Sequence, residues 1–156
     1  MSAVYKMKIL GKTLKEYIWP IKYYVMGAVL VVISQYYIAL PLSDRFPFIL
    51  NLTQALWAVM VALSVIKLVL FHNFKFKNVL VLGVLYSFII HGPKAFVFRV
   101  FLFPYPDIFG WQLLLHLLNR FFYGSFLVMV IVIILGLLFI KLKNNPEVRE
   151  SSKWLK

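Results

Sequence analysis

The length of its uncharged apolar runs constrains this chain most. Residues 23–43, 46–66 and 121–140 contain no Asp, Glu, Lys or Arg, and each run is about 20 residues long. A helix needs about 20 mostly apolar residues to cross the hydrocarbon core of a bilayer. The third run, which includes LVMVIVIILGLLFI, is the most apolar stretch of the chain. These three runs predict membrane-spanning helices.

The composition favours the same class of protein. Hydrophobic residues make up 63% of the 156 residues and charged residues 14%, against about 45–50% and about 25% in soluble domains. A soluble domain of this size would expose apolar patches far larger than monomers tolerate. Disorder is excluded as well, because disordered chains have low hydrophobicity. We therefore expect one integral membrane domain.

A fourth span is less distinct. Residues 78–93 are uncharged, and adding residues 94–98 gives a spanning length with Lys94 and Arg99 near one end, where long basic side chains can reach headgroups. Pro104 and Pro106 then interrupt the helix. Residues 108–140 would form a helix of about 50 Å, longer than the core of about 30 Å. Residues 108–119 are therefore either transmembrane or interfacial.

The basic residues predict the orientation. The formal charge is +12, and basic residues alternate between many and few along the N-terminal segment, the three loops and the C-terminal tail. The positive-inside rule then puts both termini on the cytoplasmic or equivalent face. The predicted fold is an all-α integral membrane protein with four transmembrane helices, at about 21–43, 46–67, 78–100 and 112–140, and a basic tail at 141–156.

The segment before the first span is amphipathic. Five apolar residues recur at helical spacing, and the lysines fall largely between them: Met7, Leu10, Leu14, Tyr17 and Ile18. This pattern predicts an N-terminal amphipathic interfacial helix over 3–19. Its lysines, Lys8, Lys12 and Lys15, are expected to contact lipid headgroups.

Polar residues gather in the half of the spans that the topology places outside. Spans two, three and four each carry them along one helical face. Polar groups inside a membrane cost free energy, so their presence there points to a function. We expect these faces to meet in one ligand-binding cluster. Its predicted members are Asn51, Gln54, His91, Lys94, Gln112, His116, Asn119 and Arg120.

Several uses of this cluster stay open. His91 and His116 are of the right type to hold a haem between facing helices. The basic and histidine side chains could instead donate to a quinone or to a lipid headgroup. The simplest alternative is interhelical hydrogen bonding. No resident cofactor and no metal site are expected, with haem or quinone as possible exceptions.

Catalysis is poorly supported. The five carboxylates, Glu16, Asp44, Asp107, Glu147 and Glu150, lie outside or at the edges of the spans, and there is no cysteine. Nucleotide-binding, metal-hydrolase and nucleophile-elbow motifs are absent. The distribution of lysines beside apolar runs indicates contact with lipid rather than nucleic acid. Trp57 and Phe96 are expected to face lipid or the core, without a role at a cofactor.

The function predicted from these features is that of a non-enzymatic accessory or assembly subunit of a larger membrane complex. The expected partners are membrane lipids and other membrane protein subunits. Two alternatives remain open. One is a ligand-binding membrane subunit that holds a lipid, quinone or haem between spans two, three and four. The other is a small transporter or an oligomeric channel.

Overall fold

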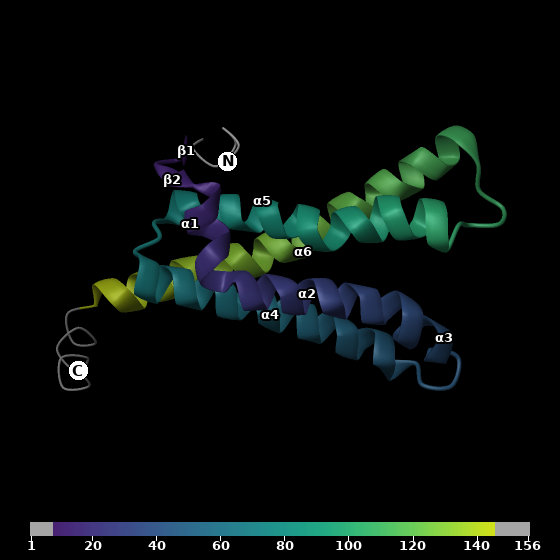
Figure 1. Cartoon of the computed structure of the whole chain (residues 1–156), viewed down its shortest axis with the longest axis horizontal. Coiled ribbons are helices and arrows are strands. Elements are labelled where there is room, and N and C mark those ends of the chain that lie inside the picture. The colour runs from purple at the N-terminus through teal and green to yellow at the C-terminus, as the bar shows by residue number, and fades with distance from the viewer. Residues whose placement is uncertain (1–7, 146–156) are drawn as a thin grey trace.

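The computed structural model describes residues 8–145, which form a bundle of helices preceded by a short hairpin (Figure 1). Four helical segments are long and apolar enough to cross a membrane: Leu14–Leu42, Phe48–His72, Phe76–Leu102 and Gly110–Asn144. The predicted class, a multi-pass all-α membrane protein, agrees with these four helices by their length and composition. Residues 146–156 of the predicted tail and residues 3–7 of the predicted N-terminal helix lie outside the described residues, whereas residues 141–144 of that tail continue the last helix.

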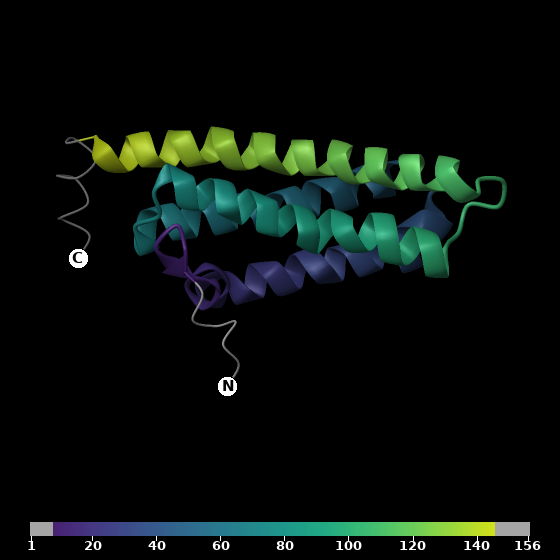
Figure 2. The ribbon, with the colours of Figure 1, turned by 90° about the horizontal axis from the view of Figure 1, so that it is seen from above.

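The helices run alternately up and down the bundle (Figures 1 and 2). From Lys22 onward, the first of these four segments consists of α2 (Lys22–Ser34), a π-helical turn η3 (Gln35–Ala39) and α3 (Leu40–Leu42). The other helices are α4 (Phe48–His72), α5 (Phe76–Gly92), its π-helical continuation η4 (Pro93–Leu102) and α6 (Gly110–Asn144). The ambiguous residues from Gly110 onward thus belong to one continuous helix with the last span.

The N-terminal segment differs from the prediction. Two short strands, β1 (Lys8–Ile9) and β2 (Lys12–Thr13), pair antiparallel, with Lys8 opposite Thr13. Helix α1 (Leu14–Ile18) follows, and a 3₁₀ turn η2 (Trp19–Ile21) leads into α2. The predicted helix over 3–19 is therefore wrong for residues 8–13. Helix α1 runs across the end of the bundle, roughly perpendicular to α2 (Figures 1 and 2).

Local chemistry explains where α1 begins. The side chain of Thr13 accepts a hydrogen bond from Glu16 N, and the Glu16 carboxylate accepts from Thr13 N at 2.7 Å. This reciprocal capping box fixes a helix start at Leu14. Leu10 and Gly11 form the hairpin turn with φ of 50° and 86°, which a helix does not allow. Local turn and capping chemistry therefore outweighs the helical spacing of the apolar residues.

The hairpin lies at the same end of the bundle as the last turns of α4 and α6. Lys12 Nζ donates to His72 O at 3.5 Å, and Lys143 Nζ donates to Val69 O at 3.0 Å and to Asn73 Oδ1. We call this the hairpin end, and the half of the bundle away from it the far half. The side of the membrane that the hairpin end faces stays a prediction.

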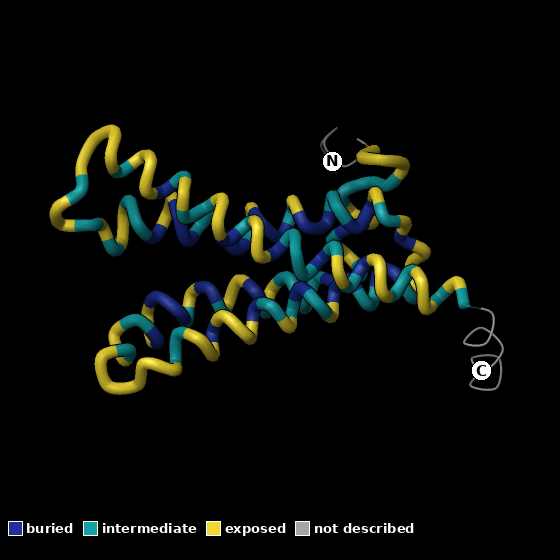
Figure 3. Tube along the Cα trace, turned by 180° about the vertical axis from the view of Figure 1, so that it is seen from behind, coloured by how far each residue is buried: buried dark blue, intermediate teal, exposed yellow. Residues whose placement is uncertain are grey.

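Helix α6 packs against α5 along its length and also meets α4 near the hairpin end. Near the hairpin end it lies beside α4, and in the far half its Phe121 contacts Phe88 and Phe96 of the α5–η4 helix. The pairs α2–α4 and α5–α6 diverge toward the far half, while buried residues line the surfaces where helices meet (Figures 1 and 3). Gly136 of α6 permits close packing, because an added Cβ would lie 2.7 Å from Val79 Cγ1.

Candidate functional site: a buried basic cluster

Three side chains from two neighbouring helices meet in the far half of the bundle. Trp57 comes from α4, His91 from the last turn of α5 and Lys94 from the first turn of η4, and they are 2%, 7% and 4% exposed. The rings of Trp57 and His91 meet edge to face, with centroids 5.4 Å apart. Lys94 Nζ lies 5.5 Å from the centre of the Trp57 ring. The ammonium group thus lies inside the protein and does not reach its surface.

Helix α6 completes the site from the opposite side. Arg120 lies close enough to interact electrostatically with both His91 and Lys94. Four residues later on the same helical face, Gly124 leaves room for the imidazole, since a Cβ there would collide with the His91 ring. We call Trp57, His91, Lys94 and Arg120 the basic cluster.

The sequence around Pro93 sets the position of Lys94. Proline lacks a backbone N–H, so the α-helical ladder cannot continue through it unchanged. The helix widens into π-helical turns from Pro93 to Leu102, a form that often occurs at functional sites. Tyr36 of η3 holds this segment in place, because its hydroxyl donates to Lys94 O at 2.9 Å and its ring stacks on Phe98 at 4.4 Å.

Two nitrogen atoms of the basic cluster lack hydrogen-bond partners in the described part of the chain. Lys94 Nζ and His91 Nε2 are buried without a hydrogen-bond partner among residues 8–145. A buried polar group without a partner costs about 1–3 kcal/mol, and more if it is charged. An oxyanion beside Lys94 and His91 would supply the hydrogen-bond partner that their buried nitrogens lack, and the charge of Arg120 would favour it further. The site is therefore suited chemically to binding an anion.

The structure brings together part of the predicted cluster. His91, Lys94 and Arg120 converge, and Gln54 joins them indirectly, because its Oε1 accepts a hydrogen bond from Trp57 Nε1 at 2.9 Å. The other four predicted residues are exposed on the helix surfaces and do not reach the basic cluster's interior: Asn51, Gln112, His116 and Asn119.

His91 and His116 do not face one another. His91 packs beside Gly124, which is eight residues, or about 12 Å, along α6 from His116. His116 contacts the edge of Tyr105 instead, with ring centroids 4.7 Å apart. Arg120 Nη1 donates to the same tyrosine hydroxyl at 2.9 Å. This arrangement does not suit two axial ligands on one haem iron.

Sequence reasoning missed two members of the site. Trp57 was expected to face lipid or the core without a ligand role, yet it forms one wall of the basic cluster. Gly124 carries no side chain, so only its position relative to neighbours shows its role. Both could have been found from spacing, since Trp57 follows Gln54 by three residues and Gly124 follows Arg120 by four.

The predicted headgroup lysines have different surroundings. Lys8 is exposed on β1. Lys12 lies 4.8 Å from the Phe74 ring centre and Lys15 lies 5.6 Å from that of Trp19. Contact of these lysines with headgroups stays a prediction.

No group of three or more His, Asp or Glu side chains that could hold a metal ion occurs within residues 8–145. Comparison of the chain with protein-family models, curated proteins and solved structures finds no match. The functional argument therefore depends on the chemistry of the basic cluster.

Proposed function

We propose that this chain is a membrane protein that binds an anionic, lipid-like ligand between α4, the α5–η4 helix and α6. The observation that carries the proposal is the buried Lys94 Nζ, which has no hydrogen-bond partner among the described residues. Ionisable side chains inside a membrane are rare and mark functional sites. A ligand oxyanion would supply the acceptor that Lys94 lacks.

The charges of the basic cluster favour an oxyanion over a neutral ligand. Lys94 and Arg120 are like charges near each other, and an anion at Lys94 would accept a charge-assisted hydrogen bond and offset this repulsion. A quinone offers neutral carbonyl oxygens and would leave both cations without a counter-charge. The ligand class is therefore an amphipathic molecule with a phosphate or carboxylate group.

The apolar surroundings favour a ligand with a hydrocarbon part. Trp57 forms an apolar wall beside Lys94. Exposed apolar side chains such as Phe88 and Phe96 lie on the α5–η4 helix that carries Lys94. In a bilayer these side chains would lie among lipid chains. A ligand with its acidic group at Lys94 would keep its chain in a similar environment.

The central test is ligand binding by the purified full chain and by Lys94→Met. Thermal unfolding in a neutral detergent would be followed with and without short-chain phosphatidic acid, and separately with laurate. We expect at least one of the two anions to raise the unfolding temperature of the wild type. Lys94→Met should lose this shift, while Lys141→Met, which changes an exposed lysine at the hairpin end, should keep it.

The same variant separates a binding site from a structural lysine. Without ligand, Lys94→Met removes a buried group that lacks a partner and should raise the free energy of unfolding by about 1–3 kcal/mol. Gain of stability together with loss of the anion response is the pattern of a site that trades stability for function. Lower stability in the ligand-free variant, or an anion response equal to that of the wild type, would contradict the proposal.

Trp57 provides a local signal. Because its ring contacts both His91 and Lys94, an anion bound there should change its fluorescence emission. Trp57→Phe should remove that change in emission, whereas Trp111→Phe, at an exposed position of α6, should leave it intact. Titration with phosphatidic acid and, separately, with laurate then shows which oxyanion the site prefers, because only the preferred one should give a saturable change in emission.

The accessory-subunit function predicted from the sequence is compatible with ligand binding and stays a prediction. Its test is purification in mild detergent, followed by a native gel and mass spectrometry of the band. A stoichiometric complex with other membrane proteins would support a subunit function. A lone chain or a small homo-oligomer would contradict it.

A further inference from the structure

A second site begins at the hairpin end and does not include the basic cluster. An apolar groove of about 400 Å³ runs between the hairpin turn and the first turns of α5. Ile9 and Leu10 line it on the hairpin side, and Leu80 and Val84 line it on α5. Lys77, in the first turn of α5, lines the groove as well. The groove extends along α5 from the hairpin toward the middle of the bundle.

The hairpin turn contains an unfavourable residue whose side chain lines this groove. Leu10 has φ of 50°, a left-handed conformation that glycine and asparagine adopt much more readily than leucine. Its side chain is 56% exposed, so burial in the protein core does not explain the choice of leucine. Strained residues of this kind point to a functional contact. An apolar contact at the groove would use the leucine side chain.

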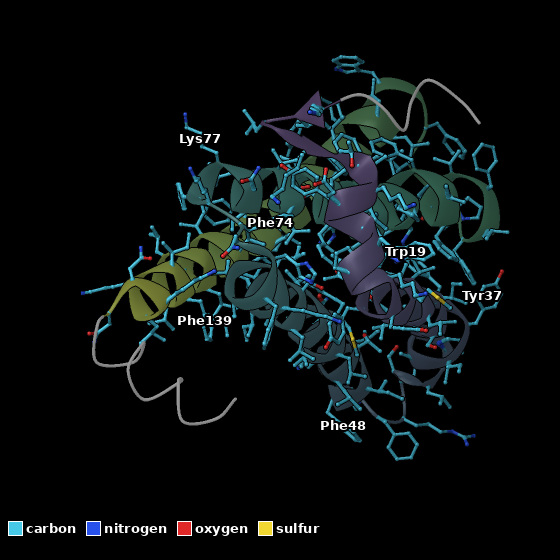
Figure 4. The ribbon with its side chains drawn as sticks, turned by 60° about the vertical axis from the view of Figure 1, so that its left-hand side comes forward. Trp19, Tyr37, Phe48, Phe74, Lys77 and Phe139 are labelled. Carbon is cyan, nitrogen blue, oxygen red and sulfur yellow. The ribbon has the colours of Figure 1, made fainter. Side chains whose placement is uncertain are left out.

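The positive charge around the groove favours an anionic occupant. Among the described residues at the hairpin end, the lysines far outnumber the single acidic residue, Glu16; the lysines are Lys8, Lys12, Lys15, Lys22, Lys67, Lys75, Lys77, Lys141 and Lys143. Lys77 extends away from the start of α5 (Figure 4). Basic groups at a membrane surface attract anionic lipid headgroups, which the cytoplasmic leaflet supplies.

We propose that this groove holds one acyl chain of an anionic phospholipid, with the headgroup phosphate at Lys77. The chain would lie against Leu80 and Val84 and pass beneath Leu10. Asn78 fixes the hairpin over this groove, since its Nδ2 donates to Leu10 O at 3.2 Å and to Tyr17 Oη at 2.9 Å. The proposal is independent of ligand binding at the basic cluster, because it involves other side chains, and Lys77 lies fourteen residues before His91 along α5.

The test is photo-crosslinking of the full chain reconstituted in phosphatidylcholine vesicles. A trace of phosphatidylglycerol or of phosphatidylcholine, each with a photoactivatable group in its acyl chain, would be added, and labelled peptides would be mapped by mass spectrometry. We expect labelling of the groove to be about fivefold stronger with phosphatidylglycerol, the effect of one lysine at a membrane surface.

Three variants and two control variants sharpen this test. Lys77→Gln should remove the preference for phosphatidylglycerol, while Lys141→Gln, another exposed lysine at the same end, should not. Val84→Trp should fill the groove and reduce labelling by both lipids, whereas Val59→Trp, at a similarly exposed position of α4, should not. Leu10→Asn suits the left-handed turn better and should reduce labelling without unfolding the hairpin.

Several outcomes would overturn the proposal. Equal labelling by the two lipids would show that no anionic headgroup is selected, and an unchanged preference in Lys77→Gln would place that headgroup elsewhere. Absence of groove labelling by either lipid would show that no acyl chain occupies the groove. Loss of the anion response at the basic cluster would leave this result unaffected.

Discussion

The hairpin end and the far half of the bundle treat their buried polar side chains differently. At the hairpin end, Asn78 Nδ2 donates to both Tyr17 Oη and Leu10 O, and this pairing ties the hairpin to α5. In the far half, Lys94 Nζ and His91 Nε2 are buried without a hydrogen-bond partner in the described part of the chain. The buried polar groups at the hairpin end thus have hydrogen-bond partners that hold the fold together, whereas several in the far half lack such partners among the described residues.

The difference extends along the helices. Ser64 and Tyr86 share a hydrogen bond of 2.5 Å that joins α4 to α5. In the far half, Gln35 Oε1 and Ser125 Oγ also lack partners among residues 8–145. Buried groups of this kind are costly, and each one in a native structure calls for an explanation. Their confinement to the diverging half indicates where a ligand would contribute to the stability of the protein.

The largest expected effect comes from Gly124→Ala in the far half. The added methyl group would collide with the His91 ring and force α6 away from α5, at a cost of about 1–3 kcal/mol in the free energy of unfolding. The anion response of the basic cluster should be lost as well, because His91 and Arg120 would shift relative to each other. Thermal unfolding with and without phosphatidic acid would measure both effects.

Gly92→Ala is the matched control for this variant. Apart from its chain neighbours, a Cβ at Gly92 meets no atom within 4 Å, so the only cost is its contact with the Pro93 ring, and the substitution should destabilise less than Gly124→Ala. If both glycine variants unfold at the same temperature, the close approach of His91 to α6 does not hold. The comparison between the two regions would then lose its main structural support.

Asn78→Ala should have the next largest effect, at the hairpin end. It removes the hydrogen bonds to Tyr17 Oη and Leu10 O, and each such bond contributes about 0.5–1.5 kcal/mol. The hairpin should then separate from α5, so limited proteolysis should cleave near Gly11 faster than in the wild type. Asn144→Ala, at an exposed position of α6, should leave the cleavage rate unchanged.

This variant also tests whether the two regions are independent. Because Asn78 lies far along α5 from His91, the anion response of the basic cluster should survive in Asn78→Ala. If that response disappears, the bundle acts as one cooperative unit, and the contrast between a satisfied end and an open half has no functional meaning.

Much of the fold was predictable from the sequence because long apolar runs predict helices that are long and apolar enough to cross a membrane. The hairpin was not, because the regular spacing of Leu10, Leu14 and Tyr17 resembles an amphipathic helix. The signals that decide the structure there are local. Gly11 permits the turn, and the reciprocal contacts of Thr13 and Glu16 fix where the helix begins.

The candidate site was predictable in part for a related reason. Helical spacing shows which residues share a face, but not how that face is rotated toward its neighbours. Because α6 packs on α5 with one face only, Gly124 meets His91 whereas Gln112 and His116 are exposed. The widened helix after Pro93 further changes which side chains point inward.

The smallest predicted effect tests the contact that holds Lys94 in place. Tyr36→Phe removes the hydrogen bond from the Tyr36 hydroxyl to Lys94 O but keeps the ring stacked on Phe98. Hydrogen bonds between membrane helices contribute about 0.6 kcal/mol on average, so unfolding should shift only slightly. Tyr37→Phe is the control, because the Tyr37 side chain is 56% exposed and its ring also contacts Phe98. A loss of anion affinity in Tyr36→Phe that exceeds its loss of stability would show that the hydroxyl positions the π-helical segment for binding. Equal behaviour of the two tyrosine variants would show instead that stacking alone holds Lys94 in the basic cluster.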